Sequence, residues 1–252
     1  TGDPNGTTRE FASDAYAVFS FLRRQAGIDP VRVGIIGHSE GGLIAAMLAA
    51  EYPEEVAFIV GLAPHGIPGA MLMLLQAAGL ATSAGASPEV ADWSAESWRG
   101  FGNRRAAEPD DDQARTAIGD SVKQSYNKAP AGVQQELGPV ESQVRAIQQF
   151  VGPWFRQFMG LEPEAYYVAV RCPVLILHGS LDQQVPASVN QTAIRQALDI
   201  GGHWEYQFEI LHGLNHLFQT AKTGSPGEYG QLEETFAPEA LALITTFIHG
   251  LP

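Results

Sequence analysis

Apolar and polar residues follow two alternating patterns along this chain, and together these patterns predict an α/β fold. Short apolar runs, continuous in three cases and alternating with polar residues in the fourth, have the length of strands. They lie at residues 31–36, 56–63, 174–177 and 204–210. Apolar residues at helical spacing predict helices at residues 9–24, 43–50, 187–198 and 238–249. Strands that alternate with helices in this way are typical of a parallel sheet.

Residues 69–165 show no strand pattern, and their apolar positions follow helical spacing instead. We interpret this segment as a cap of helices inserted between two strands of the sheet. Pro153 is expected to kink or restart one of its helices. The acidic run at residues 110–112 is expected to begin another helix, an interpretation that we prefer to a metal site. The chain therefore divides into a core part at residues 1–68, a helical cap at residues 69–165 and a second core part at residues 166–252.

The first apolar run ends abruptly at Gly37-His38-Ser39-Glu40-Gly41, and an apolar helix follows. A G-x-S-x-G pattern between a strand and a helix is typical of a nucleophile elbow, where the serine lies on a sharp turn. Glycines let neighbouring backbone pass close to such a turn. The helix that begins there directs its N-terminal N–H groups and its dipole towards a developing oxyanion. This context favours a nucleophilic Ser39 over a serine that only shapes a turn.

A nucleophilic serine needs two partners, and the sequence offers both in suitable places. A base must remove the hydroxyl proton, and a carboxylate must fix the tautomer of that base. Asp182 directly follows the third apolar run, and His216 lies in the loop after the fourth. Because the carboxyl ends of parallel strands share one sheet edge, Ser39, Asp182 and His216 are expected to lie together there.

Other polar residues near these positions are weaker candidates for a catalytic role. Glu40 lies in the first turn of a helix, where its charge suits the helix dipole. Asp199 lies at a helix end, far from the end of a strand. His38 is expected to pack against or support the site, and His65 is a candidate for contact with a substrate. The remaining histidines of these loops, His178 and His212, are expected to be structural.

Composition narrows the class of protein. Apolar residues make up 45% of the 252 residues, and the net charge of −13 disfavours nucleic acid or an anionic membrane as a partner. The single cysteine, Cys172, excludes an internal disulfide and is expected to be a buried structural thiol. No stretch approaches the roughly 18 apolar residues that a membrane span needs. Both a cytoplasmic and an exported protein are compatible with this composition.

Three segments carry a resemblance to a known family: GHSEGG at residues 37–42, LHGSLDQQVP at residues 177–186 and GLNHLF at residues 213–218. With these motifs in this order, nearly the whole chain resembles the α/β-hydrolase superfamily. The nearest branch is that of the bacterial serine esterases and serine-aminopeptidase-like hydrolases with helical caps.

The resemblance implies hydrolysis of small to medium carboxylic esters through an acyl-enzyme, without a metal or organic cofactor. It implies that Ser39 is the nucleophile, His216 the general base and then acid, and Asp182 the orienting carboxylate. The N–H of Glu40 would donate to the oxyanion. Side chains of the cap and of nearby loops would form the substrate pocket, namely His38, His65, Met71, Trp154, Phe155 and Phe158. The aromatic residues among these also suit a simple helical core.

The chain departs from the family pattern before the elbow. Complete members have several strands there, and a His-Gly loop among them supplies a second oxyanion donor. Here one predicted helix precedes the strand, and no His-Gly pair occurs before Ser39. Because the elbow strand would otherwise lie at an exposed edge, we expect a missing N-terminal segment, or a companion chain, to complete the sheet.

Two other functions remain open at this stage. A peptidase or amidase would use the same three residues, and amino-acid p-nitroanilides would distinguish it from an esterase. A hydrolase-like module that binds a ligand or partner without catalysis would fail to react with a fluorophosphonate probe.

Overall fold

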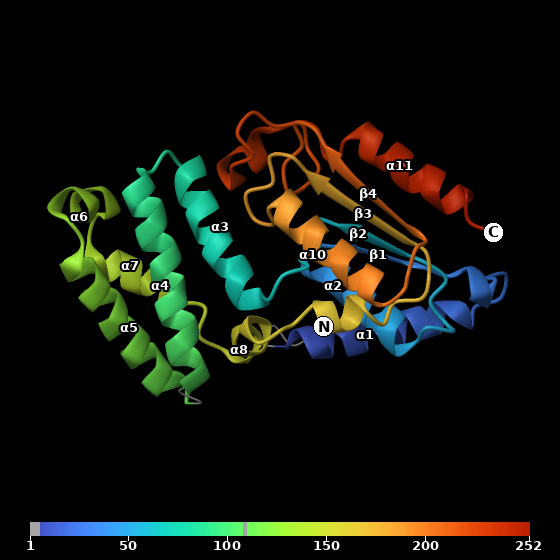
Figure 1. The fold of residues 1–252 in the computed structure, drawn as a ribbon, viewed down its shortest axis with the longest axis horizontal. Helices are drawn as coiled ribbons and strands as arrows, with labels where there is room; N and C mark the ends of the chain where they lie inside the picture. The colour runs from blue at the N-terminus through green and yellow to red at the C-terminus, as the bar shows by residue number, and fades with distance from the viewer. Residues whose placement is uncertain (1–5, 108–109) are drawn as a thin grey trace. The chain divides into compact units, whose positions relative to one another are not determined.

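A computed structural model describes residues 6–107 and 110–252 of the chain (Figure 1). The chain forms two compact units. One unit contains Thr8–Ile67 and Glu162–Pro252, and it holds every strand of the described residues. The other contains Pro68–Leu161, and its regular structure is helical throughout the described residues. The predicted α/β fold with a parallel sheet is confirmed.

Within the part of the chain that the structure describes, the sheet unit contains four parallel strands in the order β1-β2-β3-β4. The strands are β1 (Ile35–His38), β2 (Ile59–Leu62), β3 (Val174–Gly179) and β4 (Tyr206–Leu211). The helices of this unit are α1 (Thr8–Arg23), α2 (Glu40–Glu51), α9 (Glu164–Tyr167), α10 (Ala187–Ile200) and α11 (Pro238–His249). Short 3-10 helices occur at Pro30–Arg32 and Pro226–Gln231.

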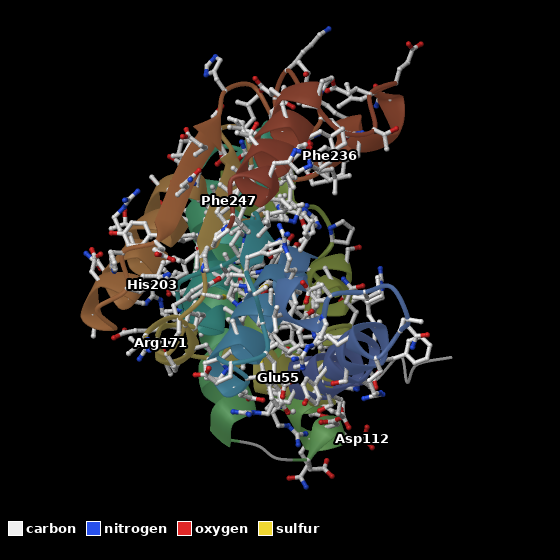
Figure 2. The ribbon with its side chains drawn as sticks, turned by 90° about the vertical axis from the view of Figure 1, so that its right-hand side faces the viewer. Glu55, Asp112, Arg171, His203, Phe236 and Phe247 are labelled. Atoms are coloured by element: carbon white, nitrogen blue, oxygen red, sulfur yellow. The ribbon has the colours of Figure 1, made fainter. Side chains whose placement is uncertain are left out.

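The helices cover both faces of the sheet, as the buried strands require. Helix α9 contacts both α2 and α10, and α1 contacts α2, which places these helices on one face. Helix α11 lies on the opposite side of the sheet from α10 (Figure 1). There Phe247 packs with alternate strand residues such as Val60 and Leu175 in a buried apolar cluster, and Phe236 lies beside it (Figure 2). Residues that face the other side of the sheet on the same strands, such as Ile59 and Ile176, are also fully buried.

The elbow strand begins later than the sequence predicts. Residues 30–32 form a 3-10 helix, in which Asp29 Oδ1 accepts a hydrogen bond from the N–H of Val31 at 3.2 Å. Pro30 favours this turn because its ring fixes φ and because it has no N–H for a strand ladder. The strand begins only at Ile35 and Val31 is 71% exposed, so the prediction of a buried strand across residues 31–36 was wrong for residues 31–34. The strand instead extends to His38, directly before Ser39.

The helical unit contains α3 (Gly69–Ser83), α4 (Pro88–Ala107), α5 (Asp111–Lys128), α6 (Ala131–Leu137), α7 (Val140–Gln148) and α8 (Pro153–Met159). Asp110 caps α5, because its Oδ1 accepts a hydrogen bond from the N–H of Gln113 at 2.9 Å. The acidic run is thus a helix start, as predicted. Pro153 begins α8 after α7 has ended, so it restarts the helix.

The single cysteine is buried, as the sequence predicts. Cys172 is buried, and burial raises the pKa of its thiol to about 12, so it is protonated and unreactive near neutral pH. Within residues 6–107 and 110–252, no helix combines the length and the apolar character required to span a bilayer.

Tyr167, at the end of α9, is fully buried. Burial raises the pKa of its hydroxyl, and none of the described residues accepts or donates a hydrogen bond to that hydroxyl. A buried polar group without a partner destabilises the folded state. Tyr167→Phe is therefore expected to raise the free energy of unfolding by about 1 kcal/mol, measured by urea denaturation. Tyr166→Phe is the matched control, because the Tyr166 hydroxyl accepts a hydrogen bond from Arg9 at 2.9 Å and should show no gain. A loss of stability in Tyr167→Phe would contradict the prediction.

Candidate active site

Ser39 lies on a sharp turn between β1 and α2. Its backbone has φ 56° and ψ −121°, a conformation that residues with a side chain rarely adopt. The turn is held in place because the N–H of Ser39 donates to the carbonyl of Leu62 on β2 at 2.7 Å. The carbonyl of Ser39 in turn accepts from the N–H of Gly42 at 3.0 Å. Ser39 therefore has the strained backbone of a nucleophile elbow, at the N-terminus of a twelve-residue helix.

Two glycines make this turn possible, and one of them is not in the five-residue pattern. A Cβ atom on Gly37 would lie 2.0 Å from the carbonyl oxygen of Gly41. A Cβ on Gly42 would lie 2.7 Å from the Cβ of Pro64. Gly41 has open space at the same point, although it is the second glycine of the pattern. Close backbone approach thus requires Gly37 and Gly42.

Asp182 and His216 form a buried hydrogen-bonded pair. Asp182 follows β3 and is 6% exposed, and His216 follows β4 and is 4% exposed. Nδ1 of His216 lies 2.8 Å from Oδ2 of Asp182. Oδ1 of the same carboxylate accepts two backbone hydrogen bonds, from the N–H groups of Gln184 and Val185, each at 2.8 Å. These bonds satisfy the carboxylate and assign the proton of His216 to Nδ1, which leaves Nε2 as an acceptor.

The loops that carry this pair are packed directly against each other. A Cβ on Gly179 would lie 2.2 Å from the carbonyl oxygen of Leu214, and the N–H of Leu181 donates to that oxygen at 2.9 Å. Asn215 shapes the turn around His216, because its Oδ1 accepts from the N–H groups of Leu217 at 2.9 Å and Gln219 at 3.0 Å. The position of the pair is therefore fixed by backbone contacts as well as by its own hydrogen bond.

His38 joins the elbow to this pair. Its Nε2 donates a hydrogen bond to the backbone oxygen of His216 at 2.8 Å, and the centroids of the two rings lie 4.6 Å apart. The residue directly before Ser39 thus touches His216. The elbow, the histidine and the carboxylate lie at the carboxyl edge of one sheet.

A family model for the alpha/beta hydrolase fold matches residues 2–207. The chain belongs to this family. Comparison with curated proteins gave no match.

Several solved structures are similar to the chain. The esterase RhEst1 from a Rhodococcus species is 18% identical over 100% of this chain and 76% of that one, with a TM-score of 0.45. A meta-cleavage product hydrolase from Pseudomonas fluorescens is 14% identical over 99% and 74%, with a TM-score of 0.48. A candidate dipeptidyl aminopeptidase IV from Bacteroides ovatus is 12% identical over 98% of this chain and 23% of that one, with a TM-score of 0.52.

Two further histidines in the sheet unit are buried and neutral. His65 follows β2 and is 1% exposed, and burial lowers its pKa to about 4. His178 on β3 is fully buried, burial lowers its pKa to about 4, and its Nε2 donates to the carbonyl of Pro64 at 3.0 Å. Asn190 supports the same loop, because its Oδ1 accepts from the N–H of Gly66 at 2.9 Å. Sequence analysis gave no role to Asn190, and nothing in the local pattern around it indicates one.

Two other carboxylates, those of Glu40 and Asp199, were candidates for the role of Asp182, and both form hydrogen bonds elsewhere. Oε1 of Glu40 accepts a hydrogen bond from the hydroxyl of Thr8 at 2.5 Å, which connects the first turns of α2 and α1. Oδ1 of Asp199 accepts from the hydroxyl of Tyr206 at 2.5 Å on the surface. Throughout residues 6–107 and 110–252, no three His, Cys, Asp or Glu side chains are grouped so that they could hold a metal ion.

The remaining pocket candidates lie in the helical unit. Phe155 and Phe158 are 1% and 5% exposed, and Trp154 stacks on Phe158 with ring centroids 5.2 Å apart. Trp98 packs against Phe155 in the same aromatic cluster, at 5.5 Å. Met71 on α3 is 46% exposed. Phe155 and Phe158 therefore contribute to the core of this unit.

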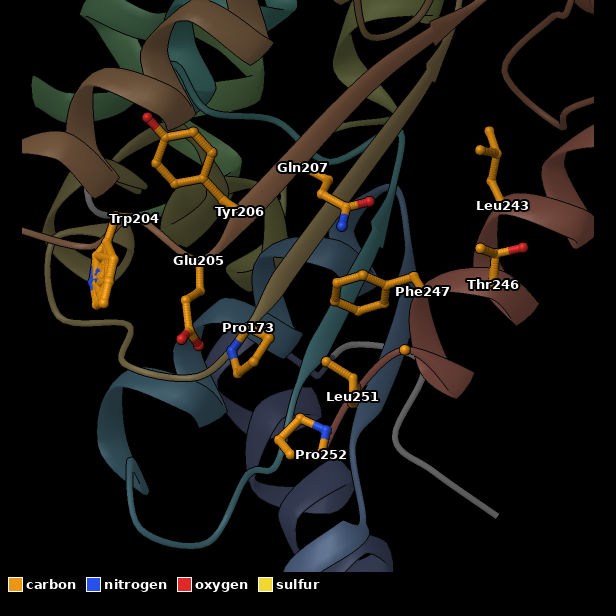
Figure 3. A pocket seen from close by; sticks show the side chains of 11 residues that line it. Pro173, Trp204, Glu205, Tyr206, Gln207, Leu243, Thr246, Phe247, Leu251 and Pro252 are labelled. Carbon is orange, nitrogen blue, oxygen red and sulfur yellow. The ribbon is translucent and has the colours of Figure 1, made fainter.

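An open groove of about 610 Å³ lies at the opposite end of the sheet (Figure 3). Pro173 and Glu205, which directly precede β3 and β4, lie on one side of it, and Phe247 of α11 lies on the other. Asp182 and His216 instead follow the far ends of these strands. The groove is therefore separate from the candidate active site.

Proposed function

We propose that the protein is a serine hydrolase that cleaves small to medium carboxylic esters through an acyl-enzyme. The observation that carries this proposal is the buried His216–Asp182 pair, joined through His38 to the strained elbow at Ser39. Nucleophilic acyl transfer requires a base with a fixed tautomer at the same sheet edge as a serine on such a turn.

The reaction proceeds in two steps. Nε2 of His216 takes the proton of the Ser39 hydroxyl as Oγ forms a bond to the carbonyl carbon of the ester, and the carbonyl oxygen becomes an oxyanion. Collapse of this intermediate breaks the bond to the alcohol oxygen, which receives the proton from His216 and leaves the acyl group on Ser39. Water then attacks the acyl-enzyme with His216 as base, and Ser39 regains its proton. Asp182 orients His216 and stabilises the imidazolium that forms in each step.

The oxyanion forms at the N-terminus of α2. We propose the N–H of Glu40 as one donor, because Glu40 is the first residue of that helix and its N–H contributes to the positive end of the dipole. No metal or organic cofactor enters this reaction.

Two measurements test the proposal. A fluorophosphonate probe is expected to label the protein at one residue, and peptide mapping should locate the label on Ser39. p-Nitrophenyl acetate and amino-acid p-nitroanilides then separate an esterase from a peptidase or amidase, which would use the same three residues. A protein that reacts with neither the probe nor the substrates is a binding module without catalysis, and the proposal is then wrong.

We further propose that residues 69–165 form a cap whose side chains contact the acyl group. The apolar and aromatic character of α3 and α8 supports this role. The residues of this segment proposed to contact the acyl group are Met71, Trp154, Phe155 and Phe158. Trp154 is the informative position because it is only partly buried, and shortening it to alanine should change acyl chain-length preference.

We also propose that a companion segment, on the same polypeptide or another, pairs with the free edge of β1. Among the described strands β1 pairs with β2 alone, and its Ile36 side chain is 50% exposed. A strand edge with exposed apolar residues next to a nucleophile is an unusual surface for a water-exposed protein. The segment would also bring the second oxyanion donor, whose loss typically lowers kcat by about a hundredfold or more.

Residues 1–252 expressed without such a segment are therefore expected to hydrolyse p-nitrophenyl acetate at least about a hundredfold more slowly than the completed protein. Native mass spectrometry identifies any bound companion chain. A monomeric, cooperatively folding chain of these residues with ordinary esterase kcat/KM would contradict the companion proposal and leave the serine hydrolase proposal intact.

A further inference from the structure

The nucleophile and its base belong to different parts of the sheet. Ser39 follows β1, whereas the loops of Asp182 and His216 follow β3 and β4, and β2 lies between them. Catalysis requires the serine oxygen and the base nitrogen to keep one separation, because a misplacement of about 1 Å can cost a hundredfold in rate. Some contact must therefore transmit the position of the elbow to the loop of His216.

The hydrogen bond of His38 is such a contact. Nε2 of His38 donates to the backbone oxygen of His216 at 2.8 Å, across 178 residues of sequence. The two rings are 4.6 Å apart and inclined by 51°, and Phe218 of the same loop presents its ring to His38 at 6.5 Å. His38 is the residue directly before Ser39, so the same piece of backbone carries the nucleophile and the side chain that holds the base.

We propose that His38 is a positioning residue that sets the place of His216 relative to Ser39. This inference rests on the proposed function of Ser39 and His216. It assigns His38 to the geometry of the reaction, and not to contact with the reacting atoms.

Backbone contacts hold both ends of this hydrogen bond. On the elbow side, the backbone around His38 is fixed by the ladder to β2 and by the close contact between Gly37 and Gly41. On the other side, a backbone hydrogen bond holds the loop of His216 against the loop of Asp182. The bond from His38 to the carbonyl of His216 joins these two segments, which follow different strands, and so fixes one relative to the other.

The electrostatics of the site agree with this role. Partial burial lowers the pKa of His38 below its ordinary value of 6.5, whereas the hydrogen bond to the backbone oxygen of His216 raises it. Of the titratable neighbours, the His216 ring lowers this pKa and Asp182 raises it, and the net shift is downwards. A neutral His38 near pH 7 donates from Nε2 without placing a positive charge beside the base.

Side-chain geometry separates a hydrogen-bonding role from simple packing. In His38→Gln, the amide nitrogen reaches about the place of Nε2 and can donate to the carbonyl of His216. In His38→Asn, the amide reaches only about the place of Nδ1, and His38→Leu keeps bulk without a donor.

His38→Leu and His38→Asn are expected to lower kcat by about ten- to a hundredfold with little change in KM, whereas His38→Gln retains most of the activity. His212→Gln, an exposed histidine of the same loop, is the control for the loss of an imidazole and should match the wild type.

Two readouts besides turnover complete the test. The rate of Ser39 labelling by a fluorophosphonate should fall in parallel with kcat in the leucine and asparagine variants. The far-downfield proton resonance of the His216–Asp182 hydrogen bond should persist in all variants, because the pair itself stays intact. Unchanged kcat and labelling in His38→Leu would overturn the inference, as would an equal loss in the glutamine variant. Failure of the proposed function is distinguishable, because the wild type would then not label at all.

Discussion

Ser39→Ala and His216→Ala are each expected to lower kcat for ester hydrolysis by about a thousandfold or more. The first removes the oxygen that forms the acyl-enzyme, and the second removes the base that takes its proton. The two losses should be far from additive, because the residues act as a unit, so the double variant should be little worse than either single variant. Initial rates with p-nitrophenyl acetate measure the effect, and Ser188→Ala, an exposed serine on α10, is the control.

The Ser39 variants also test the strain at the elbow. At φ 56° and ψ −121° a side chain costs about 1–3 kcal/mol, which glycine avoids. Ser39→Gly is therefore expected to be inactive but about 1 kcal/mol more stable than Ser39→Ala. Equal free energies of unfolding for the two variants would show that the turn is not strained. Residual labelling by a fluorophosphonate in both would show that Ser39 is not the nucleophile.

Local sequence patterns predicted the order of elements because each pattern depends on residues close together in the chain. The apolar runs located all four strands of the described residues, and Pro153 and Asp110 marked helix starts at the correct places. The main error, at residues 31–34, has a local physical reason. Pro30 and Asp29 favour a 3-10 turn, and an apolar run of that length does not reveal where the ladder to β2 begins.

Contacts between distant segments could not be predicted from the same patterns. The bond from His38 to the carbonyl of His216 depends on how two loops fold towards each other. The need for glycine at position 42 arises from Pro64, which follows a different strand. The placement of Asp182 and His216 at adjacent strand ends was predictable because parallel strands end at one edge. Their separation of 2.8 Å was not.

Asp182→Asn is expected to lower kcat by about a hundredfold to ten-thousandfold, and by less than Ser39→Ala. The amide oxygen can still accept the N–H groups of Gln184 and Val185, so the loop should keep its shape. The amide nitrogen, however, then faces Nδ1 of His216 and donates to it, which moves the imidazole proton to Nε2. A proton on Nε2 prevents that nitrogen from taking the proton of Ser39.

The structure offers a matched set of variants for this prediction. Asp182→Ala removes the acceptor for both backbone N–H groups and should cost about 1–3 kcal/mol of stability in addition to activity. Asp199→Asn, which changes an exposed carboxylate that accepts from Tyr206, should leave kcat unchanged. Urea denaturation of each variant separates loss of fold from loss of orientation. Near-normal kcat in a folded Asp182→Asn would mean that another group orients His216. Since the hydrogen bond from His38 holds only the backbone of His216, it should not replace the carboxylate in fixing the tautomer.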